Sequence, residues 1–104
     1  MINITIMAAR SGHGGLYRSE GHAEDQAICT AVTAIEDCLA AILDETSGLE
    51  CSMEASSGSC EIRWSYLADN DAADNAAAFA ATGLRRLASA YPDQVSIKIE
   101  EGQP

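Results

Sequence analysis

The segment that decides the fold is residues 21–44, GHAEDQAICTAVTAIEDCLAAILD. Apolar residues recur in it at every third or fourth position, which predicts a helix over residues 24–44 with one buried face. Glu24 and Asp25 place negative charge in the opening turn, where the helix dipole favours it. The predicted apolar stripe consists of Ile28, Val32, Ile35, Leu39 and Ile42.

The segments around this helix alternate between apolar and polar residues, which is typical of half-buried strands. Ile62, Trp64 and Tyr66, separated by polar residues, give the strongest of these patterns. Serine and glycine residues separate neighbouring segments, as expected of turns. The predicted strands are residues 2–7, 16–20, 49–55, 60–67 and 95–99.

A second helix is predicted between residue 70 and Pro92, because a proline cannot continue a helix. Either Asn70 or Asp71 is its N-cap, and Asp74 resembles the acidic member of a capping box. Alanines fill many of the other positions, so a neighbouring element can approach closely. The apolar residues that mark one face are Phe79, Leu84, Leu87 and Tyr91.

The predicted order is therefore β-β-α-β-β-α-β, which indicates an α+β fold. A mostly antiparallel sheet with two helices on one face buries the apolar side of each element. A chain of 104 residues predicts one domain over residues 1–104. Because much of the hydrophobic content is alanine, the core is thin, and we expect a homodimer to bury what remains exposed.

The net charge of −10, from 16 acidic and 6 basic residues, argues against a nucleic-acid partner, since phosphate contacts need clustered lysine and arginine. It suits either a solvated surface or a basic partner. No apolar run approaches the roughly 20 residues of a membrane span, and the N-terminus has no secretion signal. We therefore expect a cytoplasmic protein that does not bind membranes.

Four cysteines are present, and none belongs to a C-x-x-C pair, which disfavours a zinc knuckle and a thiol-redox motif. Cys38 falls inside the first helix and is expected to be buried. Cys51 and Cys60 flank a predicted hairpin turn, so the sequence leaves open whether they form a disulfide. His13, in a glycine-rich turn, and His22 lack a third metal ligand, so we expect no metal and no cofactor.

The remaining cysteine, Cys29, lies in the first turns of the predicted helix, where unpaired backbone N–H groups favour a thiolate. His22 precedes the helix on a loop and follows Gly21, so its imidazole can reach that helix end. A thiol and an imidazole so placed are the parts of a cysteine nucleophile. The alternative is a buried structural cysteine, because Cys29 borders the apolar stripe.

Several pieces of sequence, taken in order, carry a resemblance that covers nearly the whole chain. They are MINITI at residues 1–6, the glycine-rich turn SGHGG at 11–15, GHA at 21–23, ICTAVT at 28–33, GLRRL at 83–87, the Tyr91-Pro92 pair and the strand at 95–99. In this order and spacing they resemble the ribosomal-processing cysteine protease Prp family. The resemblance implies a small dimeric α+β protease that removes an N-terminal extension from a ribosomal protein, or processes a capsid-related protein in phage-borne members.

The resemblance also implies roles for individual residues. Cys29 would be the nucleophile and His22 its general base. Thr33, where the family usually has serine, and Gly21, which lets the backbone turn, would support them. The family tends to have aspartate three residues before the cysteine, whereas this chain has Gln26 there and Asp25 one place earlier.

Only six residues separate the histidine from the cysteine, fewer than the family usually has. The shorter segment keeps a second reading open, in which a catalytically inactive Prp-like homologue acts as a dimeric binding or assembly module. In the first reading the expected partner is a peptide, the basic N-terminal extension of a ribosomal protein or a capsid-related protein. The acidic surface would steer a basic peptide toward the protein.

Overall fold

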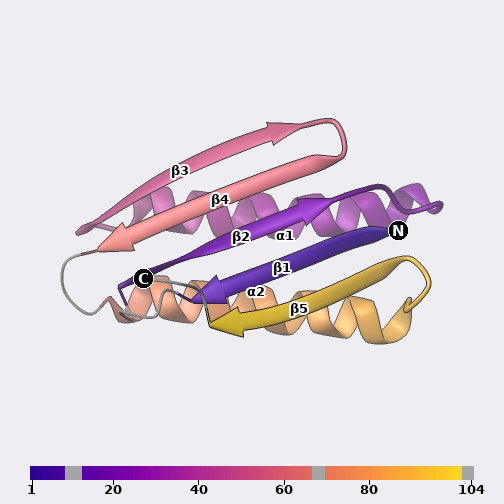
Figure 1. Ribbon diagram of the computed structural model, residues 1–104. Helices are drawn as coiled ribbons and strands as arrows, with labels where there is room; N and C mark the ends of the chain where they lie inside the picture. Colours follow the sequence, from indigo (N-terminus) through magenta and orange to yellow (C-terminus); the bar gives the residue numbers. More distant parts are fainter. Residues whose placement is uncertain (9–12, 67–69, 102–104) are drawn as a thin grey trace.

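A computed structural model describes residues 1–8, 13–66 and 70–101. It contains a five-stranded sheet in the order β3-β4-β2-β1-β5, and both helices cover the same face of it (Figure 1). This confirms the predicted α+β class and the predicted order of elements. The elements are β1 Ile2–Ala8, β2 Gly14–Glu20, α1 Gln26–Glu45, β3 Leu49–Ser56, β4 Ser59–Tyr66, α2 Asp71–Ala90 and β5 Val95–Glu101.

The sheet is mostly antiparallel, as predicted. β1 pairs with β2, β2 with β4, and β4 with β3, all in antiparallel register. β5 runs parallel to β1, with Ile97 opposite Ile4, and this direction requires the crossover that α2 supplies. The predicted end of β4 at Leu67 lies outside the described residues, as does the tail after Glu101.

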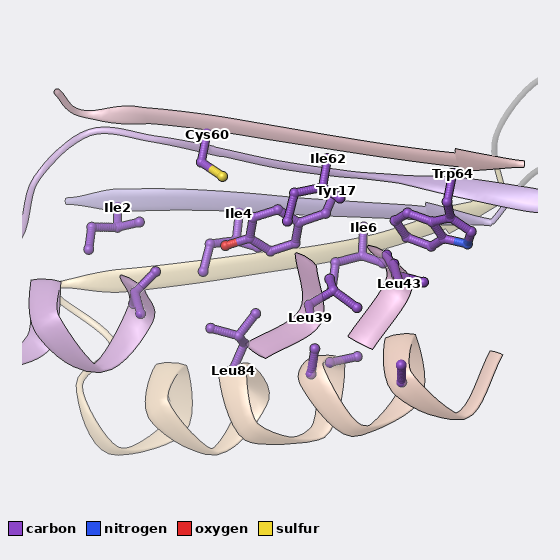
Figure 2. Close-up of a cluster of buried hydrophobic side chains, with 14 of the residues drawn as sticks. Ile2, Ile4, Ile6, Tyr17, Leu39, Leu43, Cys60, Ile62, Trp64 and Leu84 are labelled. Atoms are coloured by element: carbon purple, nitrogen blue, oxygen red, sulfur yellow. The ribbon is translucent and has the colours of Figure 1, made fainter. Parts of the chain in front are cut away.

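The core lies between the sheet and the two helices. Alternate residues of β1, β2 and β4 point toward the helices, and residues of α1 and α2 meet them (Figure 2). The largest fully buried side chains are Tyr17, Ile4, Leu43, Ile62, Leu84 and Val95. One domain with one continuous core results.

The first helix differs from its prediction at its start and on one face. Asp25 is the N-cap, and its carboxylate accepts a hydrogen bond from the Ala27 N–H at 2.9 Å, so both acidic residues precede the helix. Ile42 is 42% exposed, which corrects the predicted stripe. The buried residues are Ile28, Val32, Glu36, Leu39 and Leu43, because the sheet lies slightly to one side of the predicted stripe.

By length and composition, α1 is also apolar enough to cross a membrane, although no such run was predicted from the sequence. The core helix of a globular domain passes the same test. Here the helix packs its buried face against the sheet.

The predicted apolar face of α2 is wrong in part. Phe79 is 80% exposed and Tyr91 is 43% exposed. The buried residues are instead Ala73, Ala76, Ala80, Ala81 and Leu84. Small side chains bring α2 close to its neighbours, and Leu84 is buried with them, whereas Phe79 and Tyr91 are left outside. Asn70 is the N-cap and accepts from the Ala73 N–H, whereas Asp74 accepts from the Tyr66 hydroxyl instead of completing a capping box.

One prediction about the cysteines is wrong, and one question that the sequence left open is answered. Cys38 is exposed, because it precedes Leu39 on α1 and so points away from the buried face. Cys51 lies opposite Trp64 and Cys60 lies opposite Ala55, so the two thiols are not cross-strand neighbours. The tight turn between β3 and β4 sets this register, and all four cysteines are free thiols.

Candidate active site

A cleft of about 280 Å³ opens where the β2–α1 segment, the first turns of α1 and the β3–β4 turn meet. It brings together most of the site residues predicted from the sequence. Among its lining residues are Gly21, His22, Cys29, Thr33, Glu36 and Cys60, together with residues 56–59 of the turn.

The Cys29 thiol lies one turn into α1 and is partly buried. Its Sγ accepts a hydrogen bond from the Ala23 N–H at 3.3 Å, and the thiol reaches the Ala23 carbonyl oxygen at 3.6 Å. The backbone N–H groups of Ile28 and Cys29 both donate to the Asp25 carbonyl. Because those helix amides are already engaged, the donor that faces the sulfur comes from the preceding loop.

The His22 imidazole is exposed and lies against the β3–β4 turn. A Cβ built on Gly58 would lie only 2.6 Å from His22 Nε2. The backbone around the histidine is held firmly, since the Gly21 N–H donates to the Gly58 carbonyl and the N-terminal ammonium of Met1 donates to the His22 carbonyl, at 2.8 and 2.7 Å. Among the described residues, no hydrogen bond joins the side chains of His22 and Cys29.

The predicted supporting residues separate into two groups. Thr33 lies one helical turn after Cys29 and lines the same cleft, and Gly21 adopts a φ of 103° that turns the chain before the histidine. Asp25 does not line the cleft. It caps α1, and its N–H donates to Gln94 Oε1 at 2.9 Å, so its contacts hold the start of the helix in place.

The two histidines do not come together. His13 precedes β2 and His22 follows it, so the length of that strand separates them. The His13 ring lies beside Tyr66, with 5.9 Å between ring centroids. Within residues 1–8, 13–66 and 70–101, no group of three or more His, Cys, Asp or Glu side chains is placed to hold a metal ion.

Sequence reasoning missed the polar group at the inner end of the cleft. The Glu36 carboxylate is buried and accepts hydrogen bonds from the Tyr17 hydroxyl and the Ser19 hydroxyl. Burial, reinforced by this carboxylate, raises the pKa of Tyr17 far above its ordinary value. One signal was present, because Glu36 is an acidic residue between Val32 and Leu39 at the spacing of the apolar stripe.

The second thiol of the cleft is a poor nucleophile at neutral pH. Burial, with the negative charges of Glu36 and Asp37, raises the pKa of the Cys60 thiol to about 11. Its sulfur lies among the core side chains in Figure 2. Burial also raises the pKa of Cys51, with a contribution from Asp44. Only a thiolate attacks carbon readily, so Cys60 is not suited to catalysis.

We expect Gly58→Ala to move the His22 ring without unfolding the protein. The added methyl group would collide with the imidazole, and the φ of 80° at residue 58 costs about 1 kcal/mol in addition. The imidazole proton signals of His22 in an NMR spectrum should shift. Gly48→Ala is the matched control, because residue 48 has a similar φ of 83° and an added Cβ there would meet only Asn70 Nδ2, at an ordinary contact distance of 3.9 Å. Unchanged His22 signals in Gly58→Ala would contradict the described ring position.

The sequence matches no protein-family model and no curated protein. Solved structures do match the fold. A structure of SMU.848 from Streptococcus mutans superposes with a TM-score of 0.80 at 20% identity, covering 98% of this chain and 99% of that one. The ribosomal processing protease Prp from S. aureus, with a covalently linked product peptide, superposes with a TM-score of 0.79 at 22% identity, covering 95% and 99%.

A second structure of the same S. aureus protease, with a substrate peptide, gives a TM-score of 0.80 at 16% identity and again covers 95% of this chain and 99% of that one. Sequence identities this low establish a shared fold. The chain therefore has the fold of the Prp ribosomal processing protease over nearly its whole length.

Proposed function

We propose that this protein is a cysteine peptidase in which Cys29 is the nucleophile and His22 is the general base. The observation that carries the proposal is the cleft, where a thiol at a helix N-terminus and an imidazole lie among the same lining residues. The shared fold supports it, because Prp from S. aureus holds a substrate peptide in one structure and a covalently linked product peptide in another.

In the proposed reaction, His22 takes the Cys29 proton and the thiolate attacks the carbonyl carbon of the scissile peptide bond. The imidazolium then protonates the leaving amine, and the C–N bond breaks to leave an acyl-enzyme. A water molecule, deprotonated by His22, hydrolyses the thioester and restores the thiol. The imidazole must turn from Gly58 toward the sulfur, and its exposed position leaves room for this rotation.

The Ala23 N–H has two roles in this proposal. It donates to Cys29 Sγ in the resting state and so holds the sulfur at the mouth of the loop that precedes α1. When a carbonyl carbon binds to the sulfur, the developing oxyanion lies next to this donor and can accept from it. Thr33 adds a hydroxyl on the same side of α1.

The proposed substrate is a peptide from the basic N-terminal extension of a ribosomal protein, or a capsid-related protein. The net charge of −10 supports this choice, because an acidic protein attracts a basic peptide. In this proposal the protein acts in the cytoplasm, where the four free thiols stay reduced.

One observation favours a second candidate function, an inactive homologue that acts as a binding or assembly module. The Cys29 sulfur is held by the Ala23 backbone of the loop that precedes α1, and no hydrogen bond joins it to His22 within the described part of the chain. A module of this kind would keep the fold and bind a peptide without cutting it.

Iodoacetamide labelling across pH distinguishes the two candidates. We expect Cys29 to react fastest of the four thiols at pH 7. Cys60 should lag, and because its pKa is raised to about 11, its labelling rate should increase about tenfold for each pH unit below that value. Mass spectrometry of the digested protein measures each site separately. Four equally slow thiols at pH 7 would favour the binding module.

The protein acts as a homodimer in this proposal. The 80% exposure of Phe79 on α2 supports it, because a large apolar side chain so exposed is commonly covered by a partner. Sedimentation equilibrium should give twice the chain mass of 10.9 kDa, and Phe79→Glu should reduce it to that of one chain. Phe79→Leu, which stays apolar, should remain dimeric. A wild-type protein that sediments as a single chain at micromolar concentration would exclude the dimer.

A further inference from the structure

The most unusual feature of the cleft is a buried carboxylate with a fixed orientation. Glu36 is only 7% exposed although it borders an open cleft. The Tyr17 and Ser19 hydroxyl groups both donate to its Oε2 atom, at 2.5 Å each. Two donors from adjacent positions on one face of β2 hold the carboxylate in one orientation before any ligand binds.

The second carboxylate oxygen, Oε1, accepts no hydrogen bond from any described residue. No buried side-chain oxygen or nitrogen in the described part of the chain lacks a partner, so Oε1 is reached by solvent from the cleft. The residues that line the cleft include no lysine or arginine. Arg18 lies between Tyr17 and Ser19 in β2, so it points to the other face of the sheet, where it binds Glu61 at 2.8 Å.

We infer that Glu36 determines substrate specificity, and that its Oε1 atom accepts a hydrogen bond from a lysine or arginine side chain of the peptide. This assignment rests on the peptidase function proposed above. A buried carboxylate without a counter-ion is costly, and a cation that pairs with it offsets that cost. Because the carboxylate is already oriented, little conformational entropy is lost when the cation binds.

The position of Glu36 on α1 indicates which substrate residue it contacts. Cys29 and Glu36 are seven residues apart, so they lie on the same side of the helix, about 10 Å apart along its axis. An extended peptide rises about 3.3 Å per residue, so the basic residue is about three positions from the bond that is cut.

The test uses alkylation of Cys29 and therefore does not require cleavage. The probes are chloroacetamides that carry an aminoalkyl chain, compared with uncharged alkyl chains of the same lengths. Cys38 is an internal control, because it is exposed and lies nine residues from Cys29, on the opposite side of α1. The preference of Cys38 for the cationic probe measures how strongly the acidic protein attracts any cationic probe, without a contribution from the cleft.

At each cysteine the alkylation rate with the cationic probe is divided by the rate with the neutral probe. We expect this rate ratio to be at least about tenfold higher at Cys29 than at Cys38. The preference should appear only for chains long enough to span about 10 Å. Glu36→Gln should abolish it while keeping acceptors for Tyr17 and Ser19. Asp37→Asn is the matched variant, because it removes one charge from the next residue of α1, outside the cleft, and should keep the preference.

Equal ratios at Cys29 and Cys38, or a preference that persists in Glu36→Gln, would overturn the inference. If Glu36→Gln does not fold, the chain-length dependence in the wild-type protein decides the question. A parallel assay with peptides that carry lysine or norleucine separates the two proposals. A charge preference at Cys29 without cleavage of any peptide refutes only the peptidase function, and cleavage without that preference refutes only the role of Glu36.

Discussion

Cys29→Ala is expected to lower the rate of peptide cleavage by at least about a thousandfold while the fold is kept. The substitution removes the only sulfur of the cleft that is suited to attack, since the other thiol, Cys60, has a raised pKa. The thiol is partly buried and forms weak hydrogen bonds to Ala23, so its loss should change the free energy of unfolding little. Cleavage of a peptide from the N-terminal extension of a ribosomal protein, followed by mass spectrometry, measures the effect.

Cys38→Ala is the control, because it makes the same substitution on the same helix at an exposed position outside the cleft. It should cleave the peptide at the wild-type rate. His22→Gln should lower the rate by about a hundredfold or more, the usual contribution of a general base. A Cys29→Ala protein that still cut the peptide at the wild-type rate would refute the proposed mechanism.

Gly21→Ala is expected to cause the largest loss of stability among substitutions near the site. Residue 21 has a φ of 103°, which costs about 1–3 kcal/mol for a residue with a side chain. A Cβ there would also lie 2.1 Å from the Met1 carbonyl oxygen, a backbone atom that cannot move without disturbing β1. The chain must therefore shift at the residue that precedes His22, and cleavage should fall together with stability.

Urea denaturation measures the first effect and the peptide assay measures the second. Gly48→Ala separates backbone strain from collision, because residue 48 has a φ of 83° and its added methyl group would meet only Asn70 Nδ2, at 3.9 Å. It should lose about 1 kcal/mol and keep full activity. Equal losses in the two variants would show that the contact with Met1 has no effect on stability.

Much of the site could be predicted from the sequence because the residues are close in the chain. Six residues separate His22 from Cys29, and a strand end followed by a helix start leaves few arrangements for them. The position of Cys29 in the first turn followed from the apolar period of α1. Neither prediction depended on knowing which distant segments of the chain lie in contact.

The rest of the site comes from distant segments, whose register against one another could not be read from the sequence. Gly58, against which the His22 ring lies, belongs to a turn 36 residues further along the chain. Glu36 meets Tyr17 and Ser19 only because α1 packs on β2. The burial of alanines in place of Phe79 on α2 depends equally on how closely that helix packs against its neighbours.

The sequence by itself determined the seven elements, their order and the α+β class, since the spacing of apolar residues within a segment sets its local structure. Only the tertiary structure decided which side of each helix is buried, that Cys51 and Cys60 stay apart, and that a free carboxylate oxygen faces the cleft of Cys29. The physical reason is that these features depend on register and packing between segments far apart in the chain, which a local pattern of side chains does not fix.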